Sequence, residues 1–151
     1  MRHHNLKKQA TGFSLVELLI VVAIIGIIAT IAIPNLMVVR RASQEASAAA
    51  MTRSLVQAEN MYLSSHGNQV TYGTLNDLVN YKFIDDSLLT QDRNYYRFHV
   101  NLLSPITYNV TATPEPGTAS IMRHYYSDET GVIRVELGTP ALATSPPLNK
   151  N

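Results

Sequence analysis

The residue with the strongest chemical signal in this sequence is Glu17, a carboxylate inside an otherwise apolar run. The run extends from Phe13 to Ile33, and Glu17 is its only ionisable side chain. An isolated carboxylate in a low-dielectric environment is unfavourable unless it is paired, so such a charge usually marks a function or a partner. The alternative interpretation is a side chain that reaches the polar edge of a membrane, because Glu17 comes only four residues after Phe13.

Catalytic chemistry needs a nucleophile with a base, a metal-binding cluster or a phosphate loop, and none of the recognisable spacings for these is present. The chain has no cysteine, so disulfide and thiolate chemistry are excluded. We therefore predict no enzymatic activity, no metal and no cofactor. The five histidines are each interpreted as surface or packing residues: His3, His4, His66, His99 and His124.

Two acidic pairs, Asp85-Asp86 and Asp128-Glu129, carry oxygens of the kind that bind calcium. Calcium takes about six to eight oxygen ligands, and neither pair supplies them. Residues 128–131 are interpreted instead as a hairpin turn with Gly131 at a positive φ. The formal charge is +1, without a cluster of Lys and Arg, so nucleic-acid binding is not predicted.

The apolar run is long enough to cross a membrane. At 1.5 Å per residue, a helix over residues 13–33 would be about 32 Å long, and a hydrocarbon core is about 30 Å thick. No small-residue cleavage site follows the run, so we expect a retained anchor rather than a secretory signal. The flanking charges favour a cytoplasmic N-terminus, with Arg2, Lys7 and Lys8 before the run and Arg40 and Arg41 after it.

The segment around Glu17, residues 11–35, reads TGFSLVELLIVVAIIGIIATIAIPN. It resembles the N-terminus of type IV prepilins and type II secretion pseudopilins, a class III-type signal, nearly residue for residue. In that family a prepilin peptidase cuts after the glycine and methylates the new N-terminal amine. The resemblance therefore implies cleavage after Gly12 and methylation of Phe13. Removal of residues 1–12 would leave nine basic and eleven acidic side chains, a formal charge of −2.

The resemblance also implies how the subunit assembles. Cleavage removes three basic side chains and creates an α-amino cation at Phe13, close to Glu17. In the family's assembly model, the carboxylate pairs with the amine of a neighbouring subunit in a helical homo-oligomer. A subunit at the wrong height would leave both charges unpaired, so Glu17 would fix the register.

Further partners and locations follow from the same resemblance. They are an inner-membrane assembly platform and a cytoplasmic ATPase. The ATPase is expected to be a separate protein, because this chain has no nucleotide motif. The precursor is expected in the inner membrane with its head in the periplasm. The product is expected in a pilus on the cell surface or in a periplasmic pseudopilus.

Two residues in or next to the apolar run weaken a helix. Gly26 does so by about 1 kcal/mol, and Pro34 by about 3 kcal/mol if it lies in a helix interior. In filaments of the family the stretch between such residues, here 27–33, often melts. An ordinary proline kink is an equally good interpretation.

After Pro34 the pattern becomes amphipathic, and a helix is expected to continue to about Ser65. Gly67 would occupy the C′ position, and His66 would lie in the last turn. The small side chains of residues 46–50 would suit contact either with the head or with neighbouring subunits. One helical stripe, interpreted as core packing against a sheet, contains Ala48, Met51, Leu55, Ala58 and Tyr62.

The remainder predicts a connecting loop and an antiparallel meander. Residues 72–83 are expected to contain a short helix capped near Thr74, with Asp77 in a capping-box position. Four stretches follow with period-two character, at residues 95–103, 106–113, 119–126 and 132–137. In the first, one face should carry Tyr96, Phe98, Val100 and Leu102, and the other Arg97, His99 and Asn101.

The expected fold is α+β, a type IV pilin fold with a long N-terminal helix packed on a C-terminal antiparallel sheet. The expected parts are a leader (1–12), a membrane-spanning or filament-core helix (13–33), an amphipathic helix (34–66), a head (67–138) and a Pro-containing tail or surface arm (139–151). The leading functional hypothesis is a pilin. The alternatives are a type II secretion pseudopilin or a minor pilin and, from another class, a membrane-tethered extracytoplasmic binding module.

Overall fold

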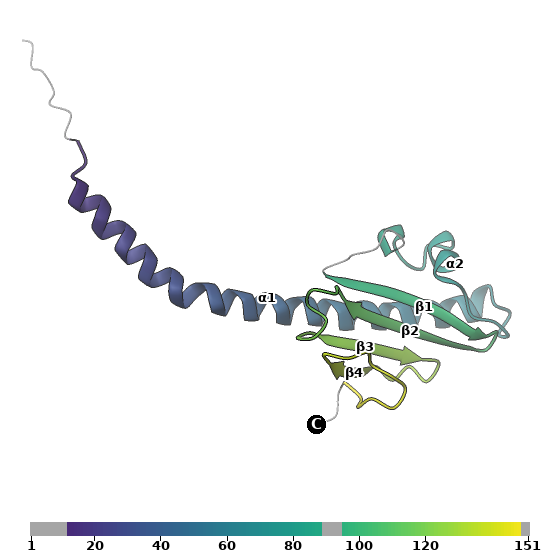
Figure 1. Ribbon diagram of the computed structural model, residues 1–151. Helices are drawn as coiled ribbons and strands as arrows, with labels where there is room; N and C mark the ends of the chain where they lie inside the picture. The colour runs from purple at the N-terminus through teal and green to yellow at the C-terminus, as the bar shows by residue number, and fades with distance from the viewer. Residues whose placement is uncertain (1–11, 89–94, 149–151) are drawn as a thin grey trace, which may run out of the picture. The chain divides into compact units, whose positions relative to one another are not determined.

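The computed structural model describes residues 12–88 and 95–148 of the chain. The elements occur in the order α1 (Leu15–Ser65), α2 (Leu75–Asn80), a 3₁₀ turn (Asp86–Leu88), β1 (Tyr96–Ser104), β2 (Thr107–Pro114), β3 (Arg123–Asp128) and β4 (Arg134–Leu137) (Figure 1). The chain divides into two compact units between Val39 and Arg40, and α1 runs through this boundary. The expected α+β architecture is confirmed.

The first unit contains the apolar part of α1. The helix continues through both Gly26 and Pro34. Leu, Ile, Val and Ala fill most of its positions, and helix formation satisfies their backbone groups within the segment itself. These apolar side chains lie on every side of the helix, a pattern typical of a helix that is buried or spans a membrane.

The second unit buries the predicted stripe of α1 against the sheet. Ala48, Leu55 and Ala58 are buried, and Met51 and Tyr62 are half-buried at the edge of the same core. Within the Ala-rich stretch, Ala48 and Ala49 face this core while Ala46 and Ala50 are exposed. The stripe therefore packs as the helical spacing predicted.

The sheet is an antiparallel meander in the order β1-β2-β3-β4. β2 alternates between half-buried and buried positions along its whole length, so one face of the sheet forms the core. On β1, Tyr96 is buried, Phe98 and Val100 are half-buried, and Leu102 on the same face is 38% exposed. The predicted division of β1 into two faces holds, with the packed face becoming exposed towards the end of the strand.

The third predicted strand is wrong at its start. Residues 118–122 form turns, in which Ile121 N and Met122 N both donate to Thr118 O at 3.1 Å, and β3 begins at Arg123. Gly138, at φ 76°, donates to Met122 O at 3.0 Å and closes this region from the far end of β4. The turn is therefore stabilised by backbone hydrogen bonds, which the apolar pattern of the sequence does not indicate.

The segment after β4 packs as a surface arm rather than a loose tail. Val135 N donates to Pro146 O at 2.9 Å, and Leu148 N donates to Ile133 O at 2.8 Å. Ala141 and Ser145 are buried. Residues 146–148 thus supply backbone partners to the outer edge of β4. The sequence does not indicate this pairing, because proline is usually excluded from sheets.

The connection between α1 and α2 depends on a close backbone approach at Gly67. Gly67 stands at the expected C′ position, but the left-handed residues are Asn68 (φ 49°) and Gln69 (φ 62°). A Cβ on Gly67 would lie 2.0 Å from the carbonyl oxygen of Thr71. The glycine is therefore required by space, and its predicted C′ position is confirmed.

We expect Gly67→Ala to destabilise the head by about 2 kcal/mol, because the backbone around Thr71 must shift to admit the new carbon. The matched control is Gly117→Ala, since a Cβ at Gly117 meets nothing within 4 Å. Thermal unfolding of the full chain in detergent, followed by circular dichroism, measures both. Equal midpoints for the two variants would contradict the close approach.

The short helix α2 begins as predicted. Thr74 Oγ1 accepts from Asp77 N at 3.2 Å, and Asp77 Oδ2 accepts from Thr74 N at 2.8 Å, which completes a capping box. His66 lies just beyond α1, where its ring packs on Tyr81, the C-cap residue of α2, with centroids 3.8 Å apart and the rings tilted by 34°. The histidine therefore contacts the end of α2 instead of lying in the last turn of α1.

Candidate functional site

The N-terminal end of α1 places the residues around Glu17 in a defined local geometry. Gly12 and Phe13 precede the helix, and Phe13 is 83% exposed. Ser14 is the N-cap residue, since its Oγ accepts from Val16 N at 3.3 Å. Glu17 Oε2 accepts from Ser14 N at 2.9 Å. Gly12 and Phe13, the residues predicted to flank the cleavage site, thus lie within five residues of the carboxylate.

This arrangement gives Glu17 a local role that the sequence analysis missed. The spacing Ser-x-x-Glu is a capping-box pattern, so the signal was available in the sequence. A carboxylate in the first turn also interacts favourably with the helix dipole, by about 0.3–1 kcal/mol. Its other oxygen, Oε1, has no hydrogen-bond partner among residues 12–88 and 95–148 and is open to a partner from outside the chain.

Beyond the cap, α1 presents a continuous apolar surface. The large apolar side chains from Leu15 to Val39 are all exposed, from 47% at Val21 to 79% at Leu15. Within the described part of the chain, α1 is the one helix long and apolar enough to cross a membrane by length and composition. Such a surface is stable only in lipid or against other apolar helices.

Gly26 and Pro34 are placed inside this surface. A Cβ on Gly26 would meet nothing within 4 Å, so this unit alone does not require glycine there. Pro34 has no N–H to donate to the carbonyl of Thr30, which therefore lacks its usual helical partner. Thr30 Oγ1 donates to Ile27 O at 2.7 Å in the same stretch. Residues of both types are expected to lower the intrinsic stability of a helix, and α1 is continuous through both positions here.

The acidic pairs and the histidine considered as candidate ligands form hydrogen bonds within turns or the core. Asp85 Oδ1 accepts from Ser87 N at 2.9 Å, and Asp128 Oδ1 accepts from Thr130 N at 3.0 Å, so each acidic pair supplies a turn. Gly131 has φ 72°, which confirms the hairpin turn. His124 is buried with Nε2 3.1 Å from Ala119 O. Among the described residues, no group of three or more His, Cys, Asp or Glu side chains is placed to hold a metal.

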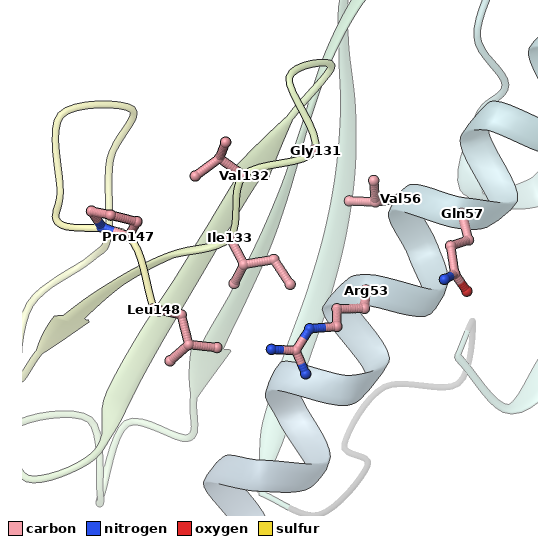
Figure 2. A pocket seen from close by; sticks show the side chains of 8 residues that line it. All are labelled: Arg53, Val56, Gln57, Gly131, Val132, Ile133, Pro147 and Leu148. Atoms are coloured by element: carbon pink, nitrogen blue, oxygen red, sulfur yellow. The ribbon is translucent and has the colours of Figure 1, made fainter. Parts of the chain in front are cut away.

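One cavity in the second unit, of about 370 Å³, lies between α1 and the chain after the β3-β4 turn (Figure 2). Arg53 supplies its guanidinium, and Val56 and Ile133 supply apolar walls. Among the described residues no carboxylate or histidine lines it, so these residues supply no group for acid-base chemistry. The full lining is Arg53, Val56, Gln57, Gly131, Val132, Ile133, Pro147 and Leu148.

Comparisons with known proteins match the N-terminal part of the chain. The family described as "Prokaryotic N-terminal methylation motif" matches residues 7–33. The type IV wide pilus major component PilA4 of Thermus thermophilus is 42% identical over 55 residues, which cover 36% of this chain and 42% of that protein. The type IV major pilin protein PilA of Myxococcus xanthus is 41% identical over 64 residues, 42% of this chain and 29% of that protein. The chain thus spans less than half the length of these relatives, and no solved structure matches it.

The long N-terminal helix followed by a four-stranded antiparallel sheet defines a pilin-like α+β fold. With the methylation motif and the similarity to two major pilins, it supports assignment of the chain to the type IV pilin family. The resemblance seen in residues 11–35 is therefore confirmed.

Proposed function

We propose that the chain is a structural subunit of a type IV pilus, not an enzyme, and that it polymerises through the apolar half of α1. The observation that carries the proposal is the exposed apolar surface from Leu15 to Val39 with one carboxylate, Glu17, in its first turn. The two relatives are a major pilus component and a major pilin, and this similarity favours a pilin over a pseudopilin or a minor pilin.

The proposed precursor lies in the inner membrane with a cytoplasmic N-terminus and a periplasmic head. Prepilin peptidase cuts after Gly12 and the new amine of Phe13 is methylated. Both residues are exposed and precede the first helical turn, where a backbone outside regular structure is accessible to a protease. The expected exit from the membrane needs an assembly platform and a separate cytoplasmic ATPase.

In the proposed filament, neighbouring helices replace lipid around α1. The amine of Phe13 and the carboxylate of Glu17 then leave water and must be paired, because an uncompensated charge in such a core is strongly unfavourable. Within one subunit Glu17 Oε2 is already bonded to Ser14 N, which leaves Oε1 for the amine of a neighbour. The pair would fix the axial position of each incoming subunit.

Fractionation of the native host tests this proposal against the membrane-tethered binding module. We expect the chain in filaments released by shearing, identified by antibody labelling and electron microscopy. A binding module would stay with the membrane pellet after shearing. Finding the chain in the pellet of cells whose sheared filaments lack it would reject the polymerising subunit.

A further inference from the structure

Glu59 is a fully buried carboxylic acid in the second unit that the proposed assembly does not use. It lies on α1, and its exposed fraction is 0%. Its Oε2 accepts from Gly73 N at 3.0 Å, whereas its Oε1 has no partner among the described residues. Tyr108, on β2, is also fully buried and its hydroxyl also lacks a partner there. Two buried oxygens without partners are costly unless a proton or water joins the cluster.

The groups around Glu59 do not supply a counter-ion. Burial raises the pKa of Glu59 to about 7, and this effect exceeds the lowering by the Gly73 amide, while Asp77 on α2 raises it further. The other titratable groups of the cluster are Tyr62 on α1, Tyr72 on the connecting loop and Tyr108 on β2. Asp128, the last residue of β3, and Glu129, which follows it, add negative charge near Tyr108. The surroundings are thus acidic or neutral and favour the protonated carboxyl.

Glu59 holds the connecting segment, defined here as residues 67–74, against α1. A Cβ on Gly73 would lie 3.0 Å from the ring of Tyr62, so the backbone at Gly73 packs tightly on the helix. The neighbouring Tyr72 N donates to Pro105 O at 2.9 Å, which joins the segment to the β1-β2 turn. Asn68 and Gln69 have left-handed backbones, which are unfavourable without support from contacts elsewhere in the segment.

We propose that the protonation state of Glu59 controls the attachment of the connecting segment: the neutral carboxyl holds it on α1, and ionisation loosens it. A neutral carboxyl keeps an acceptor for Gly73 N and needs no counter-ion in a cluster that supplies none. An ionised carboxylate must either remain as an unpaired buried charge or reach water, and water access requires Gly73 to move away. This conformational control is independent of filament formation.

The direction of the pH effect follows from proton linkage. The pKa of Glu59 is about 7 when the segment is attached and 4.5, its ordinary value, when the carboxyl is in water. The attached state therefore binds more protons between these values, so its stability is highest below pH 4.5 and falls as the pH rises towards 7. The equilibrium constant for detachment is expected to rise about tenfold between pH 6 and pH 8.

Amide hydrogen exchange of the full chain in detergent tests the proposal. In the wild type, protection of residues 67–74, corrected for intrinsic exchange, should fall about tenfold from pH 6 to pH 8. Glu59→Gln should remove this pH dependence, because the amide keeps an acceptor for Gly73 N and never ionises. The control Glu129→Gln, which removes an exposed charge near Tyr108, should behave as the wild type. The same pH dependence in wild type and Glu59→Gln would overturn the proposal.

A direct titration of the wild type keeps the test valid if Glu59→Gln folds poorly. Carboxyl carbon chemical shifts of isotope-labelled glutamates report each of the six Glu side chains separately. Glu59 should titrate with a midpoint near 7. A midpoint near 4.5 would show that Glu59 is ionised while the segment is attached, and would overturn the proposal.

Discussion

Glu17→Gln is expected to abolish pilus formation while leaving the processed subunit in the inner membrane. Glutamine can still accept a hydrogen bond from Ser14 N, so the helix start survives, but the charge that would pair with the neighbour's amine is lost. An unpaired buried charge costs about 3–5 kcal/mol, which corresponds to roughly two to four orders of magnitude in the association constant of each subunit. Quantitative immunoblotting of sheared filaments and membranes measures the effect.

The matched control for Glu17 is Ser14→Ala. It removes the hydroxyl that accepts from Val16 N, at a cost of about 1 kcal/mol in the first turn, but retains the carboxylate. Filaments should persist in this variant. If both variants assemble normally, Glu17 is only a helix cap. If both lose filaments to the same extent, the loss follows from the helix start and not from the charge.

Gly12→Val is expected to block processing, so that the chain keeps residues 1–12 and no filaments form. The physical reason is that a peptidase must bring its catalytic groups to the backbone, and glycine alone leaves that approach open on both sides. Without cleavage, no amine appears at Phe13 and the basic leader stays next to the apolar surface. Intact-mass measurement of the membrane-bound chain gives the length directly.

Gly26→Val is the matched control for Gly12→Val because it makes the same change at an exposed glycine inside α1. Its mass should show normal removal of residues 1–12. Cleavage of Gly12→Val at the wild-type rate would place the processing site elsewhere. Loss of cleavage in Gly26→Val as well would indicate that valine disturbs insertion of the helix rather than recognition by the peptidase.

The long helix, the stripe that packs on the sheet and the first two strands were predictable because they rest on local periodicity. Leu55 and Ala58 repeat with the helical period, and the alternation from Tyr96 onwards has the period of a strand. The confirmed turn at Gly131 rests on equally local chemistry, since a positive φ favours glycine. The capping box at Thr74 was likewise predictable from residues close together in the sequence.

The features that the sequence analysis got wrong or missed depend on contacts distant in the chain. Residues 118–122 look like a strand, but Gly138 N reaches Met122 O from beyond β4 and favours a turn. The arm at residues 139–148 has no periodicity, because its order comes from backbone bonds to Ile133 and Val135. Spacing alone did not reveal these partners.

Glu17 and Glu59, the two carboxylates to which roles are proposed, both stand at informative spacings in the sequence. Ser14 and Glu17 have the spacing of a capping box, which identifies the local partner of Glu17. Glu59 follows Thr52 and Leu55 at the helical spacing i, i+3, i+7, and all three side chains are fully buried. A carboxylate that shares the helical spacing of core residues is therefore expected to be buried. A search for apolar residues alone does not find it.

Intact-mass spectrometry of the dominant band in sheared filaments from the native host tests most directly whether this chain is a processed pilus subunit. The proposed function predicts a mass that begins at methylated Phe13. An uncut chain that retains residues 1–12 and is confined to the membrane fraction would contradict both the processing and the polymerisation.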